Sequence, residues 1–205
     1  MQSEIRQQVI NWLSKGKENA HRLVELSWKI DDSDETLVLE HEKVPFIIFI
    51  QFKEKTTQLL ADTGIETATI ENKARLAMYR VLLILNKQMD KSKFMLEGTN
   101  ENIMARIDLD NSTITRKELD EALNILLSSI YMMVEELNLQ EQFHERIMER
   151  MYMMIDSMER EGKNQEEIIT FLTRKTGVKE EEARALLRNV TGQSVMSREE
   201  EEMYR

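Results

Sequence analysis

The sequence predicts an α+β fold built on an antiparallel sheet. Apolar residues recur with a period of two between residues 24 and 61, and a second pair of alternating segments flanks Gly98. Elsewhere the apolar residues follow helical spacing. Short polar turns separate the strand segments, which favours antiparallel pairing over parallel crossovers. The predicted order is α–β–β–β(–β)–α–β–β–α, followed by helices only.

The first predicted helix ends at Gly16 and is followed by a strand. In this helix, apolar side chains recur at intervals of three or four residues: Ile5, Val9, Trp12 and Leu13. The period then changes to two, and the apolar positions become Val24, Leu26, Trp28 and Ile30. This alternation predicts a strand over residues 24–30 with one apolar face.

Three more strands are predicted before the next helix. Residues 37–41 form a short strand after the polar turn at 31–34. Pro45 precedes a stronger strand at 46–52, which is rich in aromatic and β-branched residues. Proline is tolerated at the start of a strand because only one ladder donor is lost. A further strand is predicted at about 56–61.

Residues 70–89 predict a helix with apolar side chains around more than half of its circumference. A helix of this kind is usually buried on most sides, so we expect it to lie across the sheet and form the core. A hairpin should follow, with strands at 93–97 and 103–109. The residues of the second strand expected to face the core are Ile103, Ala105, Ile107 and Leu109.

A capping box opens the next helix. The Thr115 hydroxyl can accept from the amide of Glu118, whose carboxylate can return to the amide of Thr115. The helical pattern continues to about Arg160, with a break near Asn138, and Gly162 ends it.

Asn164 and Glu167 form a second capping box, which opens a helix predicted to end at Gly177. Val178 leads into a last helix. The sequence therefore predicts an α+β domain over 1–138, a helical extension over 139–192, and a frayed or disordered tail over 193–205.

The composition excludes several classes of protein. The chain has 205 residues, a formal net charge of −10 and no cysteine, so disulfide frameworks and thiol nucleophiles are impossible. Both residues 1–138 and the remainder are acidic and lack a basic block, so we expect no nucleic-acid partner. No apolar segment approaches the roughly 20 residues that span a bilayer, and no secretory leader is apparent. We expect a cytoplasmic protein without a membrane partner.

No residue pattern predicts a catalytic, cofactor or metal site. His21, His41 and His144 lack the spacing of metal ligands on a helix. The segment that begins at Asp108 has Thr113 and Leu119 where a calcium loop needs glycine and glutamate. The six glycines are dispersed, so no phosphate-binding loop can form. We therefore expect no catalytic residue, no cofactor and no metal, and predict that the protein is not an enzyme.

Methionines concentrate in one helical region. The chain has fourteen, and many of them lie between Met132 and Met158. Methionine is flexible and polarisable, so a methionine face adapts to several partners. Three interpretations stay open, in this order: packing within the chain, a homodimer seam, and an exposed peptide-binding groove. The candidate partner-binding residues are Ile147, Met151, Met154, Met158, Phe171, Leu172, Val178 and Leu186.

About residues 1–138 resemble the type III secretion chaperone-like superfamily. The resemblance is carried by the helix that ends at 82–86, the hairpin of 94–96 with 107–109, and the helix opened by Thr115. It implies a non-enzymatic binding or chaperone-like module, often dimeric. Secretion chaperones do not usually carry a helical tail such as residues 139–192, so effector binding is not transferred to this chain.

Residues 164–190 show a weaker likeness, to the first two helices of ubiquitin-associated-type domains. It is carried by Thr176, Gly177 and Val178, with apolar residues on both sides. It implies a small unit that binds protein partners. A third helix is not apparent, so we favour a two-helix arm docked on the preceding helix.

These observations predict a module that acts by protein–protein interaction, with another protein or with itself as a homodimer. Two alternatives stay open. An enzyme with an unrecognised site would have a deep pocket lined by polar groups with shifted pKa values. A transcription-associated regulator would need a basic stripe on helix 179–189, where Lys179, Arg184 and Arg188 accompany three glutamates.

Overall fold

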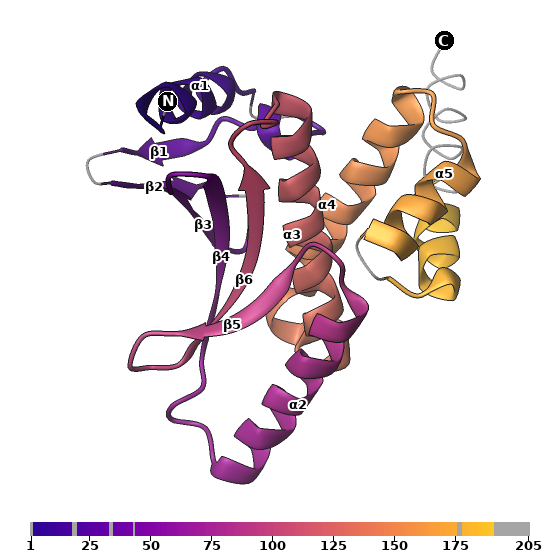
Figure 1. The fold of residues 1–205 in the computed structure, drawn as a ribbon. Coiled ribbons are helices and arrows are strands. Elements are labelled where there is room, and N and C mark those ends of the chain that lie inside the picture. The colour runs from indigo at the N-terminus through magenta and orange to yellow at the C-terminus, as the bar shows by residue number, and fades with distance from the viewer. Residues whose placement is uncertain (1, 18–19, 33–34, 43, 176–177, 191–205) are drawn as a thin grey trace.

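The computed structural model describes residues 2–17, 20–32, 35–42, 44–175 and 178–190 (Figure 1). Six antiparallel strands form one sheet in the order β1-β2-β3-β4-β6-β5, with helices following at the C-terminus. The predicted α+β class is therefore confirmed. The predicted tail over 193–205 and the helix end at Gly177 lie outside the described residues.

The observed elements follow the predicted order closely. The strands are β1 (Lys29–Asp31), β2 (Thr36–Glu40), β3 (Ile47–Phe52), β4 (Thr56–Glu66), β5 (Lys93–Glu97) and β6 (Asn102–Asp110). The helices are α1 (Gln2–Leu13), the short 3-10 helix η1 (Leu23–Glu25), α2 (Asn72–Gln88), α3 (Arg116–Glu136), α4 (Gln140–Arg160) and α5 (Gln165–Thr170). A π-helical turn η2 (Phe171–Lys175) continues α5, and a last helix is described over 180–190.

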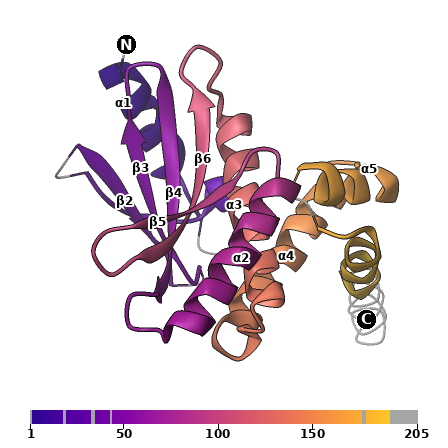
Figure 2. The ribbon, with the colours of Figure 1, turned by 60° about the horizontal axis from the view of Figure 1, so that its bottom comes forward.

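The core lies between one face of the sheet and the helices α1 and α3. Alternate residues of the central strands are buried there: Leu37, Leu39, Ile48, Ile50, Leu59, Ile103, Ala105 and Ile107. The predicted inward face of β6 is thus confirmed, with Leu109 half-buried at its end. No described helix lies over the opposite face of the sheet (Figures 1 and 2).

The helix that fills the core is α3, and the prediction that residues 70–89 fill it was wrong. α3 packs on the sheet with one side and on α4 with another, so it is buried on nearly every side from Leu119 to Val134. Even Ser128 and Ser129 are fully buried, and their hydroxyls donate to the carbonyls of Asn124 and Ile125. In α2, by contrast, only Leu82 and Leu85 are buried.

The predicted strand over 24–30 was also wrong in most of its length. The chain forms η1 there and only three residues of strand in β1. Three contacts hold this compact conformation: Lys17 N donates to Glu25 O, Trp28 Nε1 to Leu23 O, and Val24 N to an Asp120 carboxylate oxygen. The inward alternation of apolar side chains survives, since Val24, Leu26 and Trp28 are all buried.

The break that the sequence predicts near Asn138 is present, and the predicted end of the extension at 192 lies outside the described residues. Asn138 separates α3 from α4 with a φ of 55°, a left-handed conformation that asparagine tolerates well. Both predicted capping boxes are present, at Thr115 with Glu118 and at Asn164 with Glu167. The buried apolar side chains of the extension belong to the same continuous core as those of the sheet.

Candidate functional site

The predicted partner-binding residues lie inside the chain. Seven of the eight are buried, and Phe171 is half-buried: Ile147, Met151, Met154, Met158, Leu172, Val178 and Leu186 are each at most 5% exposed. Met151 contacts α3, with its sulfur 3.6 Å from the Ser128 hydroxyl. Internal packing thus occupies this methionine face in the structure. A role for these residues in binding a protein partner stays a prediction, and it would require the helices to separate.

A different apolar surface is exposed, on helix α2. Leu76 is 66% exposed, Leu83 69% and Ile84 48%. Leu76 and Leu83 are seven residues apart, as are Ala77 and Ile84, so they lie on one side of the helix, two turns apart. In Figure 2 α2 lies at the front of the molecule, with its outer side uncovered by any described element. We call this surface the α2 face: Leu76, Ala77, Arg80, Leu83, Ile84 and Lys87.

The charge on α2 has one sign only. The helix carries Lys73, Arg75, Arg80 and Lys87 and no acidic residue, in a chain whose formal net charge is −10. Lys73, Arg80 and Lys87 follow one another at seven-residue spacing, so they form a row between Leu76 and Leu83 on one side and Ala77 and Ile84 on the other. The α2 face is therefore both apolar and basic.

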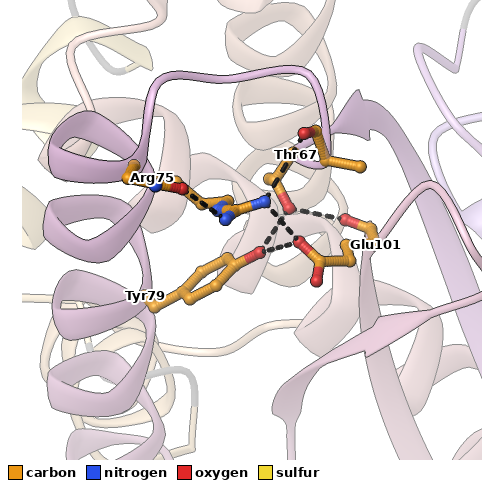
Figure 3. A network of polar contacts seen from close by, with 6 residues as sticks. Thr67, Arg75, Tyr79 and Glu101 are labelled. Atoms are coloured by element: carbon orange, nitrogen blue, oxygen red, sulfur yellow. Dashed lines mark hydrogen bonds and ion pairs between the residues drawn. The ribbon is translucent and has the colours of Figure 1, made fainter.

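The first half of α2 is fixed by a polar network on its inner side (Figure 3). Tyr79 donates to a carboxylate oxygen of Glu101 at 2.7 Å, and Arg75 reaches the same oxygen at 3.3 Å. Thr67 donates to the Glu101 carbonyl at 2.8 Å and lies 2.6 Å from the Tyr79 hydroxyl. Burial and the bond to Glu101 raise the pKa of Tyr79, which keeps it a neutral donor.

Glu101 is placed for this network by its backbone. It sits in the turn between β5 and β6 with a φ of 51°, a conformation that is uncommon for residues other than glycine. The turn thereby brings its carboxylate to Tyr79 of α2 and its carbonyl to Thr67, which lies just before α2. Strained conformations are kept where surrounding contacts specify them, and here the contacts orient α2 on the hairpin.

The second half of α2 is fixed to strand β5 by Asn86. Its side-chain amide donates to Phe94 O at 3.0 Å, and its oxygen accepts from Phe94 N at 2.6 Å. β5 is the last strand of the sheet, so these are the backbone groups that another strand would need. Asn86 therefore blocks the sheet edge and holds α2 against it, with Leu83 and Ile84 directed elsewhere.

A second apolar surface lies on the open face of the sheet. A groove of about 630 Å³ crosses it, with Val38, Phe49, Leu60 and Met104 among its lining residues. The charged residues of its lining are all acidic: Glu35, Asp62 and Glu97. We call this the sheet groove. Its charge is opposite to that of the α2 face.

Among the residues that the structure describes, no group of three or more histidine, aspartate or glutamate side chains could hold a metal ion. Lys179 bonds to Glu136 at 2.7 Å, which raises its pKa, and Arg184 pairs with Glu180 and Glu166. Two of the three cations considered for a basic stripe therefore have acidic partners within the chain. No described helix is long and apolar enough to span a bilayer.

Sequence reasoning missed the exposed residues of α2, although their signal was present. The wide apolar circumference of residues 70–89 was interpreted as burial. Two further properties distinguish this helix from the buried α3: its basic residues recur every seven positions, and its apolar stripe is divided between two opposite sides.

Two family models match the chain. One, described as a domain of unknown function (DUF8183), matches residues 8–137. The other, HTH_78, also described as a domain of unknown function, matches residues 138–205. The two matches meet at the turn between α3 and α4.

The crystal structure of YbjN from E. coli, a proposed transcription regulator, is similar with a TM-score of 0.47 and 15% sequence identity. The similarity covers 68% of this chain and 93% of that chain. No curated protein matches.

Proposed function

We propose that this chain, which belongs to the DUF8183 family through residues 8–137, is a non-enzymatic protein-binding module that pairs with a second copy of itself through the α2 face. The exposure of Leu76, Leu83 and Ile84 is the observation that carries the proposal. Large apolar side chains that stay exposed together on one side of a helix mark an interaction site. The chaperone-like role implied by the resemblance stays a prediction.

Charge complementarity supports a second copy as the occupant. The α2 face combines apolar and basic side chains, whereas the sheet groove is apolar and its charged lining residues are acidic. Opposite potentials of this kind favour association and fix its orientation. We therefore place α2 of each copy in the sheet groove of the other.

The positions of the two surfaces fit a closed pair. The β5–β6 hairpin lies between them, because Glu101 in its turn contacts α2 while Glu97 lines the groove. A two-fold axis makes the same two surfaces meet twice, so each copy gives its α2 face and receives one in return. Such a pair leaves neither surface exposed.

Other occupants fit the surface less well. Two α2 helices packed on each other would bring like charges together, because the helix carries no acid. An anionic membrane would meet the basic helix but would repel a chain of net charge −10. Strand addition at β5 would first have to displace Asn86.

Sedimentation velocity of the full chain over a range of concentrations tests the proposal. We expect a concentration-dependent dimer. Leu83→Glu should shift it to monomer without changing the circular dichroism spectrum, because Leu83 contributes little to the core. Gln7→Glu adds the same charge at an exposed position of α1 and serves as the control.

Two results would overturn the proposal. One is a wild-type chain that stays monomeric at every concentration. The other is a Leu83→Glu variant that dimerises as readily as Gln7→Glu.

A further inference from the structure

The geometry points to a second binding site, for a small organic anion, in the cleft between α3, α4 and α5. The cleft has a volume of about 900 Å³. The segment before η1, the first turns of α3, the end of α4 and the α5–η2 helix all contribute to its walls. Residues of both family-matched parts of the chain line it, and none of its lining residues belongs to α2.

Cations from separate segments converge on this cleft. They are Arg22, Arg116, Lys117, Lys163 and Arg174. Arg22 and Lys163 share one partner, Glu161, and Arg116 lies 3.6 Å from Glu25. Lys117 and Arg174 form no ion pair with another described residue. The cleft therefore has more cationic groups than its own ion pairs use.

The acidic residues of the cleft are engaged by the fold. Glu121 pairs with Lys91 at 3.1 Å, and a Glu167 carboxylate oxygen accepts from the backbone N–H of Asn164 at 2.7 Å. Asp120 accepts from the backbone N–H of Val24 at 3.2 Å. These contacts hold the carboxylates against the protein, so the cations of the cleft are the groups that a ligand would meet.

Two ionisable residues of the cleft, Lys163 and Asp120, have shifted pKa values. Burial lowers the pKa of Lys163, and the neighbouring charges of Lys117 and Arg22 lower it further. Burial raises the pKa of Asp120, which favours its neutral form. Both shifts disfavour the charged forms of these two side chains. An anion between Lys117 and Lys163 would relieve the repulsion between these two cations.

The other residues that line the cleft indicate which kind of chemical group the anionic ligand carries. Val24, Met154, Met158 and Phe171 give the cleft apolar walls, and Lys163 Nζ lies 5.9 Å from the centre of the Phe171 ring. Sites that bind small molecules combine such walls with a few polar groups that orient the ligand. The ligand class is therefore a phosphate or carboxylate joined to an apolar group.

Methyl NMR of the full chain labelled at methionine tests the inference, because Met154 and Met158 line the cleft. Phenyl phosphate should give saturable shifts of both signals, and benzoate tests the carboxylate alternative. Inorganic phosphate should bind more weakly, and benzyl alcohol, which lacks the charge, should not bind. Met104, in the sheet groove, should not move and also reports that each variant is folded.

Substitutions distinguish binding in the cleft from nonspecific attraction of anions to other lysines of the protein. Lys117→Gln and Lys163→Gln should each lower the affinity for phenyl phosphate by about tenfold, as expected when a charge-assisted hydrogen bond is lost. Lys53→Gln removes an exposed lysine between β3 and β4, outside both the cleft and the α2 face, and should leave the affinity unchanged. Affinity should also fall as the pH rises through the lowered pKa of Lys163. The inference is overturned if no probe gives saturable shifts of Met154 and Met158 at millimolar concentration, or if both cleft variants bind like Lys53→Gln.

Discussion

At the scale of single residues, Asn86 attaches α2 to strand β5 and so determines which side of the helix is exposed. Its side chain satisfies both backbone groups of Phe94, and Lys93 Nζ donates to its carbonyl at 2.7 Å. One side chain thus closes the edge of the sheet and fixes which side of α2 faces outward. An edge strand left open would be available for pairing with other chains.

Asn86→Ala should lower the free energy of unfolding by about 1–3 kcal/mol, because two hydrogen bonds to a partly buried strand are lost. Gln88→Ala, at an exposed position of the same helix end, is the control and should change it by less than about 0.5 kcal/mol. Urea unfolding measures both. Equal values for the two variants would show that Asn86 does not hold α2 to β5.

Asp120 illustrates how burial and pH are linked. Burial raises its pKa in the folded state, so the protonated form is favoured there and stability is lost as the pH rises through that pKa. Asp120→Asn removes the buried charge and keeps an acceptor for Val24 N. The variant should be more stable than the wild type at pH 7. The gain should shrink as the pH falls toward the ordinary aspartate pKa of about 3.9. Denaturant titrations at the two pH values test this, and a less stable variant at pH 7 would contradict it.

At the scale of elements, α2 has two apolar sides with different roles. Leu82 and Leu85 face the core, while Leu83 and Ile84 face outward. A helix inside a monomer needs only one apolar side. The second side of α2 is therefore the part of the sequence that the fold of one chain does not explain, and this is why we assign it to an interface.

Adjacent leucines of α2 provide a direct comparison. Leu82 is 5% exposed and Leu83 is 69% exposed. Leu82→Ala should cost about 2–5 kcal/mol of unfolding free energy, since it leaves a cavity in the core. In dilute monomer Leu83→Ala should cost less than about 0.5 kcal/mol, yet it should weaken self-association. If Leu83→Ala destabilised the dilute monomer as much as Leu82→Ala, the outward side of α2 would have to be part of the core.

Most elements could be predicted from sequence because their signals are local. The capping boxes at Thr115 and Asn164, and the alternation along β6, each identify a helix start or a strand without reference to the rest of the chain. The burial of α2 and α3 could not be told apart in this way. Both helices are rich in apolar residues, and which one meets the sheet depends on contacts far apart in sequence. The segment 24–30 failed for the same reason, since Asp120 holds its backbone from α3.

At the scale of the whole molecule, the chain has one continuous core that includes the helical extension. Met151, Met154 and Met158 pack into it from α4, together with Ile168 and Leu172 from the helices that follow. We therefore propose α2, and not the methionine-rich helix α4, as the surface that binds a protein partner. The methionines of α4 could be identified from sequence as apolar and adaptable. Only the structure shows that they are already buried in the core of the chain.

Met151→Glu should unfold or severely destabilise the protein, because it places a carboxylate at a fully buried position. The notable contrast is Leu83→Glu, which should keep the fold and lose the dimer. Thermal unfolding followed by circular dichroism distinguishes the two substitutions. A stable, folded Met151→Glu variant would show that the α3–α4 contact is not part of the core.

The pairing of the α2 face with the sheet groove is the central claim, and charge exchange tests it most directly. One variant carries Arg80→Glu with Lys87→Glu on α2, and the other carries Glu35→Lys with Glu97→Lys beside the groove. Each variant alone would bring like charges together and should sediment as a monomer. Mixing them restores opposite charges at both contacts, so the mixture should sediment as a heterodimer. A mixture that stays monomeric would contradict the claim. So would a groove variant that dimerises alone like the wild type, because the groove would then lie outside the interface.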